Sequence, residues 1–99
     1  MKYRLKNWQC FEIDSKYFGR VRVFAGVLGK GLFQVTGDLA EFDPLTRTAC
    51  TSLGNYYLLE GEAGLTPEAL EQWRDLCKKN GRTGVADVTD EIKSSMEQP

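Results

Sequence analysis

The stretch KYRLKNWQCFEI, residues 2–13, sorts its side chains by parity along the chain. Successive side chains of a β-strand point to opposite faces, so odd and even positions describe different surfaces. The odd positions carry four apolar residues, Tyr3, Leu5, Phe11 and Ile13. The even positions mix charge with aromatic and sulfur side chains, Arg4, Lys6, Trp8, Cys10 and Glu12. This pattern predicts a strand over residues 2–13 with one face against a core.

A second alternating segment, residues 20–28, predicts an antiparallel partner for this strand. Its apolar face carries Val21, Val23, Ala25 and Val27. If Glu12 lies opposite Arg20, then Trp8 lies opposite Phe24. That register joins an ion pair and an aromatic pair on one face and keeps the other face apolar, so we expect it.

Three further strands are predicted, over residues 32–42, 46–52 and 55–60. The Gly-Lys-Gly segment before the first of them is expected to be a tight turn, because it lacks the spacing of a phosphate-binding loop. Pairing Leu28 with Leu32 across this turn keeps apolar residues together.

Two glycines mark the course of these strands. Gly37 is expected at a bulge or a close backbone approach. In the last hairpin, a two-residue turn at Leu53 and Gly54 would place Cys50 opposite Tyr57. Cys50 is then expected to be a buried structural thiol, since free cysteine is among the most buried residue types.

The helix signals agree with one another over residues 66–80. Thr66 is suited to the N-cap and Pro67 to the first helical position, while Gly81 is suited to the left-handed stop. The apolar stripe of this helix repeats at helical spacing and contains Leu70, Trp73, Leu76 and Cys77. This stripe is expected to pack on the sheet.

These elements predict an α+β fold that is mainly β. We expect a five-stranded antiparallel meander, curled or closed as a small barrel, with one C-terminal helix packed on it. Residues 1–84 would form the single globular domain. Residues 85–99 would be a partly ordered extension, with a short strand at 85–88 or a short helix from about Thr89 as alternatives.

Composition restricts the chemistry. The 99 residues contain no histidine, which excludes Ser-His-Asp and Cys-His nucleophile pairs and histidine-ligated metals. The three cysteines form neither a disulfide framework nor a Cys-x-x-Cys motif. We therefore expect no enzymatic activity, no cofactor and no metal. The sequence has no apolar run long enough to cross a bilayer, so a cytoplasmic protein without membrane contact is expected.

Charge is distributed unevenly. Residues 1–36 carry seven basic and two acidic side chains, and the rest of the chain carries six basic and twelve acidic ones. A basic face with interleaved aromatic rings suits single-stranded nucleic acid. The residues that would make this contact are Arg4, Lys6, Trp8, Arg22 and Phe24. In the competing interpretation, Trp8 and Phe24 form a second core beneath the helix, because large aromatic side chains are seldom exposed.

Three function classes remain. The first is a small non-enzymatic module that binds a protein partner, such as an inhibitor or adaptor of the type encoded by phages and mobile elements. The second is a nucleic-acid-binding small barrel, whose affinity would fall steeply with salt. The third is a small-molecule binder inside the curled sheet. Its candidate residues are Tyr56, Tyr57, Asp38, Glu41 and Asp43.

Self-association is compatible with all three classes. An open meander would leave residues 2–13 and 55–60 as its two edge strands. Lysine and arginine protect the first edge, whereas Tyr56 and Tyr57 lie on a less charged one. A homodimer through an edge strand is expected as readily as a monomer.

Overall fold

The computed structural model describes residues 2–15, 19–82 and 84–97. In this part of the chain, one mixed seven-stranded sheet carries two α-helices. The elements in chain order are β1 (Lys2–Ser15), β2 (Gly19–Leu28), the 3-10 turn η1 (Gly29–Gly31), β3 (Leu32–Val35), β4 (Leu39–Asp43), β5 (Thr48–Thr51), β6 (Tyr56–Glu60), α1 (Pro67–Lys79), β7 (Ala86–Asp87) and α2 (Thr89–Glu97).

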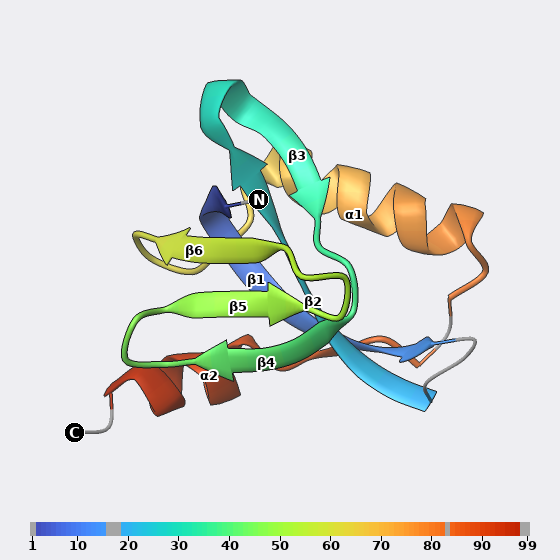
Figure 1. Cartoon of the computed structure of the whole chain (residues 1–99). Helices are drawn as coiled ribbons and strands as arrows, with labels where there is room; N and C mark the ends of the chain where they lie inside the picture. Colours follow the sequence, from blue (N-terminus) through green and yellow to red (C-terminus); the bar gives the residue numbers. More distant parts are fainter. Residues whose placement is uncertain (1, 16–18, 83, 98–99) are drawn as a thin grey trace.

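The strand order corrects the predicted meander. The order is β3-β2-β1-β6-β5-β4 (Figure 1), and β7 pairs with β1 off this path. β6 returns to run parallel to the start of β1, with Lys2 beside Tyr56 and Lys6 beside Glu60. β1 and β6 are too far apart in the chain for a local sequence pattern to predict that they pair. The sheet is therefore mixed and curled, and the edges of the main path are β3 and β4.

A bulge in β1 changes the predicted faces of that strand. Asn7 has a φ of 48°, and the pairing with β2 shifts between Lys6 and Gln9. Asparagine tolerates this left-handed conformation better than most residues. The extra residue inverts the parity, so Leu5 and Trp8 face the same core although one position is odd and the other even. The prediction of a single odd-numbered apolar face was wrong for this reason.

The register between β1 and β2 also differs from the prediction, by two residues. Glu12 pairs with Arg22, Cys10 with Phe24, and Asp14 with Arg20. A two-residue shift does not by itself exchange the two faces of a strand, so the apolar pattern cannot distinguish the two registers. Residues 16–18, which connect β1 to β2, lie outside the described residues.

The predicted strand over residues 32–42 is divided into β3 and β4. The register across η1 is confirmed, since Leu28 pairs with Leu32. Thr36 then ends β3, because its hydroxyl accepts a hydrogen bond from the Phe24 amide and its own amide donates to the Phe24 carbonyl. Gly37 is a corner at which the chain leaves β3, and a β-carbon there would come no closer than 3.9 Å to other atoms. Neither a bulge nor a close approach is present at Gly37.

The β5–β6 hairpin is shifted by one residue from its predicted register. Cys50 pairs with Tyr56, not with Tyr57. The loop has three residues instead of two: Thr51 accepts from the Gly54 amide and donates to the Asn55 carbonyl, and Gly54 has a φ of 87°. Glycine at this left-handed position is typical of a three-residue hairpin loop. A shift of one exchanges the two faces, so Tyr57 is buried and Cys50 lies on the opposite face.

The helix prediction for residues 66–80 is confirmed. α1 has Thr66 as its N-cap, with the hydroxyl accepting from the Ala69 amide at 3.2 Å, and Asn80 as its C-cap. Trp73 projects from α1 onto Phe11, with the rings stacked at 4.4 Å. We call the cluster under α1 the helix core; it consists of Phe11, Ile13, Val23, Ala25 and Trp73.

A second cluster fills the opposite face of β1 and β2. This sheet core contains Leu5, Trp8, Cys10, Phe24, Ala49, Tyr57, Leu59, Val88 and Ile92. The burial of Trp8 and Phe24 agrees with the second-core interpretation, but the cover is β4, β5, β6 and α2, not α1. Both alternatives for residues 85–99 are realised, since β7 and α2 follow one another and Ile92 is buried.

Candidate functional site

Two rows of side chains cross the face of the sheet that points away from the sheet core. One row runs over β1, β6, β5 and β4 through Lys2, Tyr56, Cys50 and Glu41. The next row contains Arg4, Leu58, Thr48 and Asp43. We call this surface the outer face. Each row has a basic residue on β1, an acidic residue on β4 and uncharged residues between them.

The charges at the two sides of the outer face cannot pair with each other. Three strand spacings separate β1 from β4, which is roughly 14 Å. Among the described residues, Arg4 forms an ion pair at 3.7 Å with Glu60 on β6, and its side chain stays 75% exposed. The outer face is therefore electrostatically polarised, positive along β1 and negative along β4.

A groove of about 900 Å³ lies on the outer face. Its uncharged floor includes Cys50, Tyr56 and Leu58, and Phe42 and Pro44 line it at the β4 side. Tyr56 is 43% exposed at the middle of the sheet, whereas the other exposed large apolar residues, Leu32, Leu45 and Leu53, lie at or beside turns. An exposed aromatic ring on a rigid strand between charged margins is typical of a recognition surface.

The structure separates the five residues predicted to bind nucleic acid. Trp8 and Phe24 are 1% and 0% exposed and contact each other edge-on at 5.9 Å inside the sheet core. Stacking on a base needs an exposed ring face, so these two rings cannot supply it. Arg4 and Lys6 remain on the surface at the start of β1.

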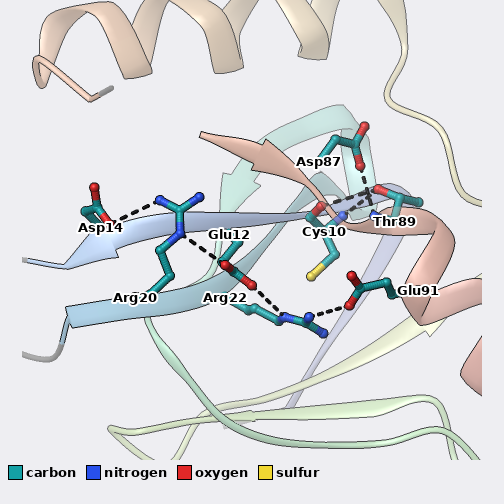
Figure 2. Close-up of polar contacts among 8 residues, drawn as sticks. All are labelled: Cys10, Glu12, Asp14, Arg20, Arg22, Asp87, Thr89 and Glu91. Carbon is teal, nitrogen blue, oxygen red and sulfur yellow. Dashed lines mark hydrogen bonds and ion pairs between the residues drawn. The ribbon is translucent and has the colours of Figure 1, made fainter. Parts of the chain in front are cut away.

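Arg22, the fifth predicted residue, belongs to a chain of ion pairs (Figure 2). Its guanidinium contacts Glu12 at 3.4 Å and also binds Glu91 of α2. Arg20 continues the chain by pairing with Glu12 at 3.0 Å and Asp14 at 3.1 Å. These carboxylates already neutralise both arginines, so neither presents a free cation to a phosphate backbone.

The same region fastens α2 to β1. The Thr89 hydroxyl accepts from the Cys10 amide at 3.0 Å, and the Val88 amide donates to the Cys10 carbonyl. Asp87 accepts from the Thr89 amide at 2.9 Å and from the Gln9 side chain at 3.0 Å. These contacts hold α2 against β1 and keep Trp8 covered, so these side chains stabilise the fold.

The edge candidates also change their positions. β6 lies between β1 and β5, so neither it nor β1 is an edge of the main sheet path, and the predicted dimer edges were wrong. Tyr57 is 4% exposed and stacks on Tyr3 at 5.0 Å, which removes it from any interface. Tyr56 is retained. Of the predicted acidic cluster, Glu41 and Asp43 reach the groove with Tyr56, whereas Asp38 does not line it.

The cysteines are all free. Burial raises the pKa of the Cys10 thiol to about 12 and also raises the pKa of Cys77, which disfavours the reactive thiolate at neutral pH. Cys50 is half-buried in the groove, so its predicted full burial was wrong. Within the described ranges, no group of acidic and cysteine side chains could hold a metal ion.

Sequence reasoning missed most of the groove, namely Lys2, Tyr3, Phe42, Pro44, Thr46, Thr48, Cys50 and Leu58. The missing information was the hairpin register. Placing Gly54 at the left-handed position of a three-residue loop would have set Cys50 beside Tyr56 and brought the alternate residues of β4, β5 and β6 to one face.

Comparisons with known proteins found no match to this chain, either among family models, among curated proteins or among solved structures. No helix in the described part of the chain is long and apolar enough to span a bilayer.

Proposed function

We propose that this protein is a small non-enzymatic binding module that engages a protein partner through its outer face. The observation that carries the proposal is Tyr56, a 43% exposed ring at the centre of a polarised strand surface. Tyrosine is among the residues that most often dominate interface energetics, because it buries a large apolar area with few rotatable bonds.

Charge supports the same assignment. Lys2 and Arg4 on one side and Glu41 and Asp43 on the other would orient a partner whose charges are arranged in the opposite order. Complementary margins of this kind fix orientation and reject partners with the reverse polarity. An inhibitor or adaptor needs these properties and no catalytic group.

Selection from a phage-displayed random-peptide library tests the proposal. Peptides enriched on the wild-type protein should lose roughly 30-fold in affinity on Tyr56→Ala, which corresponds to about 2 kcal/mol for a central aromatic contact. The matched control is Leu53→Ala, since Leu53 is 87% exposed at a turn and does not line the groove.

Both variants alter exposed side chains, and thermal unfolding would verify that each keeps the fold. Equal affinity on wild type and Tyr56→Ala would contradict the proposal, and so would a library from which no peptide is enriched.

A small-molecule ligand is the second candidate for this groove. The specific observation in its favour is that Tyr56, Glu41 and Asp43 line one concavity whose volume falls within the range of ligand sites. A fragment screen by thermal shift on wild type and Tyr56→Ala would identify ligands that depend on the tyrosine.

A further inference from the structure

The curled sheet is not closed between β4 and the start of β2. β4 pairs with β5 on one side, and no other described strand pairs with its second side. Yet β4 and β2 approach each other, and a groove of about 750 Å³ lies between them. Residues from Arg20 to Arg22 line one side of this gap and residues from Leu39 to Phe42 the other. Ile92 and Ser95 of α2 also line it.

An open strand edge presents unpaired backbone donors and acceptors, and an extended segment of another protein can satisfy them by adding a strand. The side chains of β4 then determine what that segment must carry. Glu41 and Asp43 are exposed on the outer face, whereas Phe42 points inward and contacts Phe24 at 5.6 Å. From Glu41 to Asp43 the side chains therefore alternate, with the acids outside and the aromatic ring inside.

We propose that β4 takes up an extended segment of a partner protein in which basic residues alternate with apolar ones. Cross-strand neighbours interact directly, so lysine or arginine at alternate positions would face Glu41 and Asp43. The intervening apolar residues would lie beside Phe42, toward Ile92 and Val21. This assignment rests on the proposed protein-binding function and names the chemistry of the partner.

The charge of the gap favours the same partner. Its lining includes three carboxylates, Glu12, Glu41 and Glu91, against two guanidiniums, those of Arg20 and Arg22. Both guanidiniums are already in ion pairs with Glu12, Asp14 or Glu91 (Figure 2). Among the described residues that line the gap, Glu41 is therefore the charged side chain that forms no ion pair.

A second copy of this chain is a poorer occupant of β4. Antiparallel pairing of β4 with its own copy about a two-fold axis would bring Glu41 and Asp43 of one chain beside the same acids of the other. Like charges in opposed positions destabilise a strand pair. The other open edge, β3, carries no charged side chain over Leu32–Val35, so it offers no selection for a basic segment.

The probe is a fluorescent peptide in which lysine and valine alternate, compared with one in which glutamate and valine alternate. Fluorescence anisotropy should show that wild type prefers the lysine peptide by roughly tenfold, as expected for two exposed cross-strand charge pairs. Glu41→Lys/Asp43→Lys should reverse this preference. The control Glu71→Lys/Asp75→Lys makes the same change of net charge on the exposed side of α1 and should leave the preference unchanged.

Two further measurements separate strand addition from binding in the groove of the outer face. N-methylation of the peptide backbone should abolish binding, because it removes the hydrogen bonds of an added strand, and hydrogen exchange should slow at the amides of Leu39–Asp43. Binding that survives N-methylation but is lost in Tyr56→Ala would overturn strand addition and leave the proposed function standing. Protection at Leu32–Val35 instead, or equal affinity for the two peptides, would also overturn it.

Discussion

Replacing Gly26 with alanine tests the bend of β1, on which the positions of Lys2 and Arg4 depend. Gly26 lies on β2 between Ala25 and Val27, whose partners Gln9 and Lys6 flank the bulge of β1. A β-carbon at this position would lie 2.7 Å from Leu5 Cγ and 2.8 Å from the Lys6 carbonyl oxygen. Ordinary contacts of a β-carbon begin at about 3.4 Å, so the two neighbours would have to retreat by roughly 0.6–0.7 Å.

The expected cost is at the upper end of the range for overpacking, about 3 kcal/mol. Leu5 is 0% exposed and packed on all sides, and the Lys6 carbonyl belongs to the backbone, so neither can rotate away. Urea unfolding followed by tryptophan fluorescence would measure the change. With an m-value near 2 kcal/mol per M, the midpoint of Gly26→Ala should fall by about 1.5 M.

Gly37→Ala is the matched control for this experiment. Gly37 has no positive φ, and its added β-carbon would come no closer than 3.9 Å to other atoms. Restricting the unfolded chain should leave this variant as stable as wild type or up to about 1 kcal/mol more stable. Equal midpoints for Gly26→Ala and Gly37→Ala would show that β2 does not approach the bulge of β1 closely at Gly26. The bend of β1 would then not depend on this contact.

Two further predictions concern the cover over the sheet core. The pKa of the Cys10 thiol is raised from its ordinary value of 9.0 to about 12, so the stability from the neutral thiol is complete below pH 9 and is lost as the pH rises toward 12. Between pH 9 and pH 11, urea midpoints should show wild type losing about 1.4 kcal/mol per pH unit more than Cys10→Ala, and parallel losses would exclude burial of the thiol. Thr89→Val should cost about 1–3 kcal/mol, because the buried Cys10 amide loses its acceptor. Thr89→Ser keeps the hydroxyl and should retain most of this stability; a Thr89→Val variant as stable as wild type would contradict the role of this hydrogen bond.

Some of this fold could be predicted because the signals are local. Thr66, Pro67 and the basic last turn specify α1 within a few residues of its ends, where capping acts on neighbouring amides. The pairing of Leu28 with Leu32 follows from a short turn that leaves few registers open. The absence of histidine removes whole classes of mechanism wherever the chain folds.

The proposed binding surface could be predicted only in part. Tyr56, Arg4, Glu41 and Asp43 were identified as candidates, but they were divided among different hypotheses. Their common face depends on the three-residue loop at Gly54 and on the parallel pairing of β6 with β1, and each of these sets a register. Because a shift of one residue exchanges the faces of a strand, a small error in a turn moves a whole row of side chains from groove to core.

The sequence by itself determined the composition of the protein, its predominantly β character and the boundaries of α1, since these follow from residue chemistry and from interactions within a few positions. Only the tertiary structure decided that β6 lies beside β1, that the bulge at Asn7 turns Trp8 inward beneath α2, and that β4 is left with an open edge. The physical reason is that these features depend on contacts between segments up to about eighty residues apart. Burial of the whole core selects which segments pair, and the hydrophobic periodicity of a single segment does not identify its partner.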